Sequence, residues 1–257
     1  FPKSTLEPPL GSGPYKVKEF EANRDVVYER VQDYWAVNHP TKRGEYNFDI
    51  LRYEYYRDAT VSLEAFKAGN YDFRSETSSK DWATAYAVPA LRDGDLIKRE
   101  VKHNRSSGMQ GFVFNLRRPL FKDYRVRRAL NLVFDFETLN QTIFYNQYER
   151  IDSFFYGIPL RWEGLPTGKE LDILKTVKDE VPPEVFTTEY ENPVNGGGRA
   201  HRQNLREALR LLQDAGFEQR DGMMVDTKTG QPFSFELILN GPTIERVALP
   251  FAEDLRK

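Results

Sequence analysis

Cysteine is absent from this sequence of 257 residues. Without it there can be no disulfide framework, no thiolate metal site and no thiol nucleophile. Long apolar runs are absent as well, because none approaches the roughly 20 residues that a membrane-spanning helix needs. No basic and then apolar leader segment is seen at the amino end. We therefore expect these residues to fold in water, which fits the bacterial periplasm without requiring it.

A surplus of charge of either sign is also missing. The chain has 37 basic and 39 acidic residues. Nothing in this balance favours nucleic acid or an anionic membrane as a partner, so we predict no nucleic acid binding. The three histidines, His39, His103 and His201, lie far apart with no second ligand at metal-binding spacing. We predict that they are ordinary surface residues and that the chain holds no metal and no cofactor.

Catalytic signatures are scarce. There is no Gly-x-Ser-x-Gly elbow and no phosphate-binding Walker loop, and no serine has a histidine nearby to suggest a proton relay. Acidic residues are abundant, however, and a catalytic pair of carboxylates could be scattered among them. A hydrolytic enzyme of glycosidase-like or peptidase-like type therefore remains the alternative to a binding protein.

The spacing of the apolar residues predicts a mixture of strands and helices. In the first part of the chain we expect a hairpin at 15–20 and 26–31, a strand at 48–56, a helix that begins after the N-cap Asp58 and ends at Gly69, and a strand at 71–73. Further along we expect a helical region at 78–91 broken by Pro89, strands at 96–102 and 112–114, helices at 123–133, 136–145, 170–181 and 204–215, and a hairpin of 223–226 with 233–239. Residues 192–198, which include three consecutive glycines, are predicted to form a flexible surface loop.

Three motifs connect this chain to a known family. The central one runs from Phe112 through Asn115 and Pro119 to the helix start Asp123-Tyr124-Arg125-Val126-Arg127-Arg128-Ala129-Leu130. The other two are Gly11-Ser12-Gly13-Pro14-Tyr15 and the helix end Ala65 to Phe73. In this order, the three motifs resemble those of the dipeptide- and oligopeptide-binding proteins of ABC importers, the family 5 extracellular solute-binding proteins. Within that family, Arg52 to Asp58 and Arg117-Arg118-Pro119 are similar to the branch linked to oligopeptide and microcin C uptake.

The resemblance implies an α/β, periplasmic-binding-protein-like two-lobed fold of the peptide-binding type, present here as a partial chain. Residues 1–115 would belong to the first α/β lobe, and residues 116–257 would begin the second lobe, rich in helix and with a β-hairpin. The implied function is that of an extracytoplasmic, periplasmic substrate-binding subunit of an ABC transporter. Its partners would be an oligopeptide or peptide-like ligand, held between the lobes, and the membrane permease that receives it.

The ligand contacts are expected where strands of such a sheet end and where the chain crosses between lobes. Arg57 and Asp58 lie between a predicted strand and a predicted helix, and Ser75, Glu76 and Thr77 follow a predicted strand. Met109, Gln110 and Phe112 enter the crossing segment, where the family has the floor of its cleft. Asp58 can equally be explained as a helix cap, Arg57 as a surface charge and Phe112 as a core residue.

The two ends of the sequence suggest a piece of a longer protein. The chain opens at Phe1 rather than at a methionine, and it closes at Lys257 in an amphipathic segment without a helix-ending signal. Val247, Leu249, Phe251, Ala252 and Leu255 are the expected apolar face of that segment. We therefore expect the later part of the second lobe to lie outside this sequence.

Overall fold

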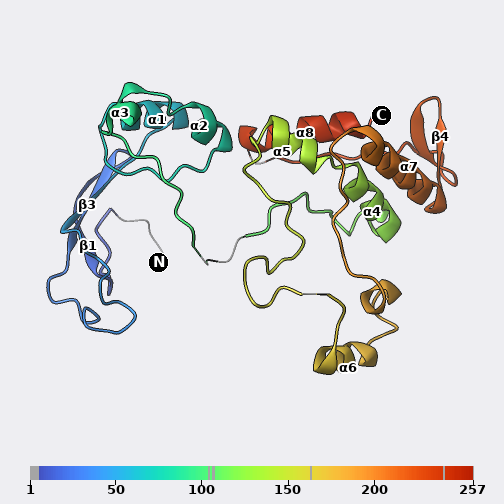
Figure 1. The fold of residues 1–257 in the computed structure, drawn as a ribbon, viewed down its shortest axis with the longest axis horizontal. Coiled ribbons are helices and arrows are strands. Elements are labelled where there is room, and N and C mark those ends of the chain that lie inside the picture. The colour runs from blue at the N-terminus through green and yellow to red at the C-terminus, as the bar shows by residue number, and fades with distance from the viewer. Residues whose placement is uncertain (1–5, 104, 106–107, 163, 240, 257) are drawn as a thin grey trace. The chain divides into compact units, whose positions relative to one another are not determined.

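The computed structural model of this chain describes residues 6–103, 105, 108–162, 164–239 and 241–256 (Figure 1). The chain forms two compact units. Unit 1 consists of Phe1–Ser75 and Ala87–Ile97, and unit 2 of Glu76–Tyr86 and Lys98–Lys257. The predicted division of lobes at residue 115 concerns the longer protein and stays a prediction.

Unit 1 is built on an antiparallel sheet in which neighbouring strands follow one another along the chain. Its strands are β1 (Tyr15–Glu21), β2 (Asp25–Arg30) and β3 (Ile50–Glu54), in the order β1-β2-β3. The predicted hairpin and third strand are thus confirmed. The central strand β2 is the best buried, with Asp25 and Val27 at its inner positions.

The first helix of unit 1 has the ends that its sequence predicts. Helix α1 (Ala59–Lys67) begins after Asp58, whose side chain accepts hydrogen bonds from the backbone N–H groups of Thr60 and Val61. It ends just before Gly69, whose φ of 77° lies in the left-handed region that glycine adopts without strain. The predicted helical region at 78–91 is instead two short helices, α2 (Ser79–Thr84) in unit 2 and α3 (Pro89–Asp93) in unit 1.

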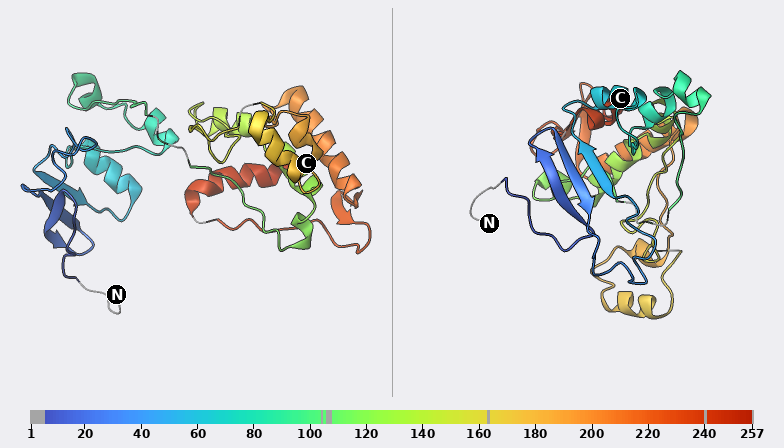
Figure 2. Two further views of the ribbon diagram at one scale, coloured as in Figure 1. Left: turned by 90° about the horizontal axis from the view of Figure 1, so that it is seen from below. Right: turned by 90° about the vertical axis from the view of Figure 1, so that its left-hand side faces the viewer.

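Unit 2 is mainly helical, as Figure 2 shows from two further directions. Its other elements are η1 (Pro119–Phe121), α4 (Tyr124–Val133), α5 (Phe136–Thr142), α6 (Gly168–Thr176), η2 (Pro183–Phe186), α7 (Gly198–Asp214), β4 (Phe217–Arg220), β5 (Met223–Asp226) and α8 (Pro242–Asp254). None of the helices in the described part of the chain combines the length and the apolar character required to cross a membrane.

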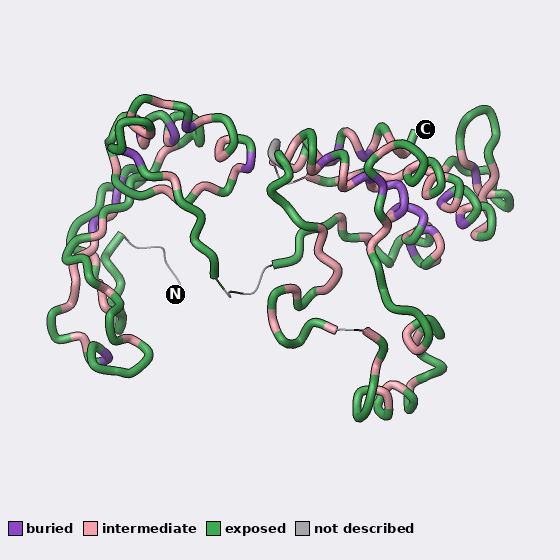
Figure 3. The backbone as a smooth tube through the Cα atoms, viewed as in Figure 1, coloured by how far each residue is buried: buried purple, intermediate pink, exposed green. Residues whose placement is uncertain are grey.

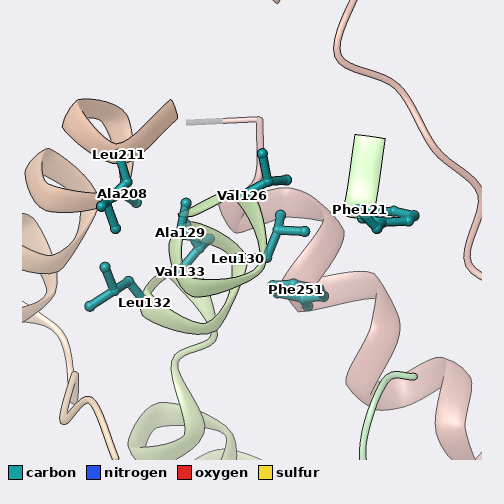
Figure 4. Packing of buried hydrophobic residues seen from close by; sticks show 9 residues of the cluster. All are labelled: Phe121, Val126, Ala129, Leu130, Leu132, Val133, Ala208, Leu211 and Phe251. Atoms are coloured by element: carbon teal, nitrogen blue, oxygen red, sulfur yellow. The ribbon is translucent and has the colours of Figure 1, made fainter. Parts of the chain in front are cut away.

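The core of unit 2 forms around α4. This helix places Val126, Ala129, Leu130 and Val133 on its buried face, and Val126 and Leu130 are only 1% and 2% exposed. Figure 4 shows these side chains between Ala208 and Leu211 of α7 and Phe251 of α8. The same core is lined by partly buried aromatic residues from extended segments: Phe112, Phe114, Phe233 and Phe235.

The central motif of the sequence is explained by this packing. Asp123 is the N-cap of α4, and Arg125 binds its carboxylate and also donates to the carbonyl of Asp214 at the end of α7, 2.6 Å away. Arg127 donates to the carbonyls of Phe121 and Lys122, which close the turn of η1. The charged residues of this motif therefore have a structural role in joining η1, α4 and α7.

Three predicted strands are not formed among the described residues. Residues 71–73, 96–102 and 112–114 are extended or bent, without strand pairing. At 112–114 the side chains still alternate, since Phe112 and Phe114 face the core whereas Val113 is 96% exposed. A strand needs a neighbour to receive its backbone hydrogen bonds, and the periodicity of a sequence does not show where that neighbour is.

The predicted hairpin of 223–226 with 233–239 forms only at its turn, where Val225 makes an isolated antiparallel bridge to Pro232 and Asp226 donates to the carbonyl of Gln231. The regular partner of strand β5 is β4, which was not predicted; the two strands are joined by a tight turn at Asp221-Gly222, both of which have positive φ. Asp-Gly is the usual composition of such a turn. Residues 233–239 are extended with alternating exposure, and beyond Phe233, which donates to the carbonyl of Met224, the described residues show no backbone hydrogen bond along this segment.

Two further differences concern the later helices. Helix α7 begins at Gly198 rather than at residue 204, and it therefore takes up one of the glycines of the predicted loop. In α8 the buried residues are Ala248 and Phe251, whereas Leu249, placed on the apolar face by its sequence pattern, is 56% exposed. Figure 3 marks the buried residues; within unit 2, α4 has more of them than α7, and α6 has none.

Candidate functional site

Within unit 1, the predicted ligand residues Arg57 and Asp58 stand at the start of α1. Both are exposed. One oxygen of Asp58 accepts the two capping hydrogen bonds, at 2.8 and 3.1 Å, and the cap role is therefore confirmed. The other oxygen has no hydrogen bond among the described residues, so a carboxylate oxygen remains available to a ligand. Ser75, the third predicted residue of this unit, is exposed after the end of α1.

Glu76 lies in unit 2, at the start of a small polar and aromatic cluster around α2. Its carboxylate accepts a hydrogen bond from the backbone N–H of Ser78 at 2.9 Å and from the hydroxyl of Tyr86 at 2.7 Å. Tyr86 is buried. The ammonium of Lys98 lies 4.2 Å from the centre of the Trp82 ring and donates to the carbonyl of Trp82. Glu76 thus fixes the entry to α2, whatever else it contacts.

The remaining predicted ligand residues of unit 2 differ in how exposed they are. Thr77 and Gln110 are exposed, and Met109 is 49% exposed. Phe112 is partly buried and stacks on Phe251 with ring centres 5.3 Å apart. Unit 2 therefore has Met109 and Gln110 open to a ligand at the entrance of the crossing segment, while Phe112 already packs on the core. Whether any of the eight residues contacts a ligand stays a prediction.

A charged pocket of unit 1 was not foreseen. Asp25 is 8% exposed, and its carboxylate is 2.8 Å from Arg52 and 3.8 Å from Arg24. Arg52 also reaches Glu54, whose other oxygen accepts a hydrogen bond from Tyr56. A pocket of about 260 Å³ is lined by Arg24, Asp25, Arg52, Glu54, Tyr55 and Tyr56. The signal in the sequence was the alternation of charged residues on two strands that pair Asp25 with Glu54.

A second polar network, in unit 2, was also missed. Asn195 is 5% exposed, and its amide donates to the carbonyls of Leu132 and Phe134 at the end of α4. Its carbonyl oxygen accepts from Asn204 and lies 3.1 Å from Nδ1 of His201. The prediction of a flexible surface loop at 192–198 is thus wrong at its centre, because Asn195 is held inside the fold.

The same network contains the cap of α5. Asp135 is buried and accepts hydrogen bonds from Thr138 and from the backbone N–H of Gly196. Burial by itself raises the pKa of the Asp135 carboxyl, but these hydrogen bonds and the nearby His201 together hold the pKa below its ordinary value. His201 is therefore a partly buried member of a network, and the prediction of an ordinary surface histidine is wrong for it.

Arg150 contacts residues next to this network. It donates to the carbonyl of Pro193 at 2.6 Å and to the side-chain oxygen of Asn131 at 2.8 Å, and it lies over the ring of Phe134. Burial lowers the pKa of its guanidinium from the ordinary value. All of these contacts join parts of unit 2 to one another, so they explain stability rather than chemistry. Among the described residues, no three histidine or acidic side chains are grouped in a way that could hold a metal ion.

The comparisons with known proteins agree on one family. A family model described as bacterial extracellular solute-binding proteins, family 5 Middle, matches residues 1–257. Among curated proteins, the chain is 49% identical over 257 residues to the uncharacterized protein y4wM of Sinorhizobium fredii, covering 99% of this chain and 39% of that protein. It is 47% identical over 257 residues to the probable peptide-binding protein YejA of Agrobacterium fabrum, covering 99% and 42%. The chain thus spans about two fifths of the length of these relatives.

Two solved structures are similar in fold. NikA from Brucella suis, in complex with Fe(III)-EDTA, has a TM-score of 0.59 at 20% identity and is matched over 96% of this chain and 41% of its own. The oligopeptide-binding protein AppA from Bacillus subtilis, in complex with a nonapeptide, has a TM-score of 0.54 at 21% identity, with coverage of 96% and 40%. At this level of identity, the similarity establishes the fold, which is the α/β fold of this family with only part of its lobes present.

Proposed function

This chain belongs to the family 5 bacterial extracellular solute-binding proteins, and from that membership we propose that it is part of the substrate-binding subunit of an ABC transporter. In this role the whole protein captures oligopeptides between two lobes outside the cytoplasmic membrane and delivers them to a membrane permease. The match of the family model over the full length of the chain is the observation that carries the proposal. The peptide as ligand class is supported by the 47% identical relative that is named a probable peptide-binding protein.

Two extended segments of unit 2 lack regular strand partners, which supports the proposal that the longer protein supplies further strands. Residues 112–114 and 233–239 both alternate between core-facing and exposed side chains, although in the described chain neither segment is part of a sheet and residues 234–239 have no backbone hydrogen bond. Buried or partly buried peptide groups are almost always hydrogen-bonded in a native protein. We propose that further strands of the longer protein pair with both segments and complete the second lobe.

The proposed peptide contacts are the eight residues identified in the sequence. These residues are Arg57, Asp58, Ser75, Glu76, Thr77, Met109, Gln110 and Phe112. Asp58 has one carboxylate oxygen free of hydrogen bonds to the described residues, and Met109 and Gln110 are exposed. A carboxylate and a side-chain amide suit the hydrogen-bonding groups of a peptide, and the flexible thioether of methionine adapts to varied side chains.

The test uses the full-length protein, purified, denatured and analysed by mass spectrometry for released small molecules. Co-purified short peptides, with tight rebinding in calorimetry, are the expected result. Turnover of model glycosides or peptides by the intact protein, with no retained ligand, would favour the hydrolase instead. The affinity of the 257-residue chain alone for such a peptide should be on the order of a hundredfold lower than that of the full-length protein. Incomplete lobes bury only a small part of the ligand's surface.

Substitutions can separate a structural role from a ligand contact at two of the proposed positions. Asp58→Ser keeps a side-chain oxygen that can cap α1 but removes the carboxylate. Glu76→Gln keeps an acceptor for Ser78 or Tyr86 and removes the charge. If these carboxylates contact the peptide, both variants should retain the melting temperature of the parent within a few degrees and bind the peptide about tenfold more weakly. Unchanged affinity in either variant would remove that residue from the site.

A further inference from the structure

Helix α7 has a row of arginines along the side that faces away from the core. Arg199, Arg202 and Arg206 follow one another at spacings of three and four residues, which places them on one face of a helix. All three are exposed. The buried residues Ala208 and Leu211 lie on the opposite side, against α4. We call Arg199, Arg202 and Arg206 the arginine row.

The charges of the arginine row are not neutralised within the described chain. None of its three guanidinium groups forms an ion pair with a described residue. The next arginine on this face, Arg210, differs in this respect, because it pairs with Glu207 at 2.8 Å and with Asp214 at 2.5 Å. Two of the acidic groups in this region are therefore already used, and the row presents its three cations to its surroundings.

Within the described chain, the arginine row has no visible role in stabilising α7. The first turn of α7 has no acidic residue, although acidic residues are the ones that the partial positive charge at a helix N-terminus favours. Arg199 instead places positive charge in this first turn, which costs stability locally. A local cost without a gain in packing is typical of residues that serve a function rather than the fold. The whole chain is close to neutral, so the row is also not a by-product of composition.

The geometry favours an acidic protein segment over a membrane surface. The row is narrow, and Glu207 and Asp214 border it on one edge, where they would repel a continuous anionic plane. Of the large apolar residues of α7, Leu205, Leu211 and Leu212 belong to the core, and Leu209 is 37% exposed, which leaves one leucine as the apolar surface that this helix could insert into lipid. From Arg199 to Arg206 the helix rises by seven steps of about 1.5 Å, so the three guanidinium groups span roughly 10 Å. Carboxylates at spacings of three and four residues on a partner helix match that row, and each guanidinium can bind a carboxylate through two hydrogen bonds.

We propose that the arginine row is a docking surface for an acidic, helical segment of a partner protein. The identification of that partner as the membrane permease rests on the proposed transport function, whereas the carboxylate chemistry does not. Glu207 and Asp214, on one side of the row, restrict how a partner can bind. Its carboxylates must lie opposite the arginines and not opposite these two acidic residues.

The first experiment measures binding of the full-length protein to its permease, reconstituted in nanodiscs of zwitterionic lipid. The test variant replaces all three residues of the row: Arg199→Gln, Arg202→Gln and Arg206→Gln. The control removes three positive charges from exposed positions at and after α6: Lys169→Gln, Lys175→Gln and Lys178→Gln. We expect the test variant to bind the permease about tenfold more weakly or worse, with a flatter salt dependence, and the control to bind like the parent.

Three outcomes would overturn the proposal. Equal weakening in both variants would mean that only net charge matters. Unchanged permease binding in the test variant, with loss of binding to phosphatidylglycerol vesicles, would assign the row to lipid. A melting temperature several degrees below that of the parent would show that the rest of the protein packs on the row.

A second probe separates this proposal from the transport function. It is a labelled helical peptide with glutamates at spacings of three and four residues, compared with a scrambled peptide of the same composition. The full-length parent should bind the ordered peptide at least severalfold more tightly than the scrambled one, and the test variant should not distinguish them. If the protein binds neither permease nor transported peptides but still discriminates in this way, the transport function fails and the docking surface stands. No discrimination by the parent overturns the docking surface.

Discussion

The two units of this chain differ in how far they bury their own apolar residues. Unit 2 encloses Val126 and Leu130 almost completely within a cluster drawn from α4, α7 and α8. Unit 1 buries few large residues, such as Val27 and Leu63, and exposes Trp35, Phe48 and Tyr53. Buried apolar area is the main stabilising contribution to a fold. The comparison shows that unit 2 has a central apolar cluster contributed by several helices, whereas the buried apolar residues of unit 1 are few.

The strongest test of this difference makes the same substitution in both units. Leu130→Ala should lower the free energy of unfolding of unit 2 by about 4 kcal/mol, because its neighbours on three helices cannot close the cavity. Leu63→Ala should lower the free energy of unfolding of unit 1 by about 2 kcal/mol. Fewer buried side chains surround α1, so its neighbours can move in to fill the cavity. Hydrogen exchange read by mass spectrometry as a function of urea reports the two units separately. Equal losses would mean that unit 1 has a core as well packed as that of unit 2.

A second test asks how far polar contacts add to the stability of unit 2. Asp135→Asn should lower its free energy of unfolding at pH 7 by about 1–3 kcal/mol, because the carboxylate accepts hydrogen bonds from Thr138 and Gly196. The folded-state pKa of Asp135 lies below its ordinary value of 3.8. The advantage of the parent is therefore complete above that value and is lost as the pH falls through the folded-state pKa.

Urea titrations at several pH values from neutral to about pH 2 check this prediction. The difference between parent and Asp135→Asn should shrink in the acidic part of this range. The matched control is Asp172→Asn at an exposed position on α6, which should change stability by no more than about 0.5 kcal/mol. A difference that stays constant with pH would show that the Asp135 carboxylate does not stabilise the fold through its charge.

The smallest expected effect compares the two N-caps. Asp58→Ala should cost about 1 kcal/mol, the usual value for a lost cap. Asp123→Ala should cost about 2 kcal/mol, because Asp123 also holds Arg125, which in turn binds the carbonyl at the end of α7. Arg125 also holds the pKa of the Asp123 carboxyl below its ordinary value. Thermal unfolding of both variants measures the two costs, and a larger loss for Asp58 would contradict the view that α4 is the more deeply integrated helix.

Local signals in the sequence predicted local structure well. The predicted cap Asp58 begins α1, and the helices predicted at 123–133 and 136–145 begin with the caps Asp123 and Asp135. The hairpin of β1 and β2 was predicted from alternation and a turn. The local Asp-Gly signal of the turn between β4 and β5 was missed. What could not be predicted was pairing and burial across long separations: the partners of residues 112–114 and 233–239, and the inward position of Asn195. These features depend on which distant residues meet, and periodicity carries no information about that.

For the candidate site, the sequence indicated chemical types but not their surroundings. Glu76 was predicted as a ligand contact from its place after a strand, and its hydrogen bonds to Ser78 and Tyr86 show that it also organises α2. The charged pocket around Asp25 and Arg52 escaped prediction, because its members come from different strands and become neighbours only when those strands pair.

The long connection between α5 and α7 can tolerate changes in its length. Arg125 and Asp214 are 89 positions apart, yet they join the ends of the two helices that form the core. The entropy lost in closing such a loop grows only with the logarithm of its length, so doubling it costs roughly 0.6 kcal/mol. The segment around α6, which buries no residue, can therefore be lengthened, shortened or replaced by an inserted domain at little cost in equilibrium stability. The larger effect would be kinetic, because α4 must wait longer to meet α7 as the connection grows.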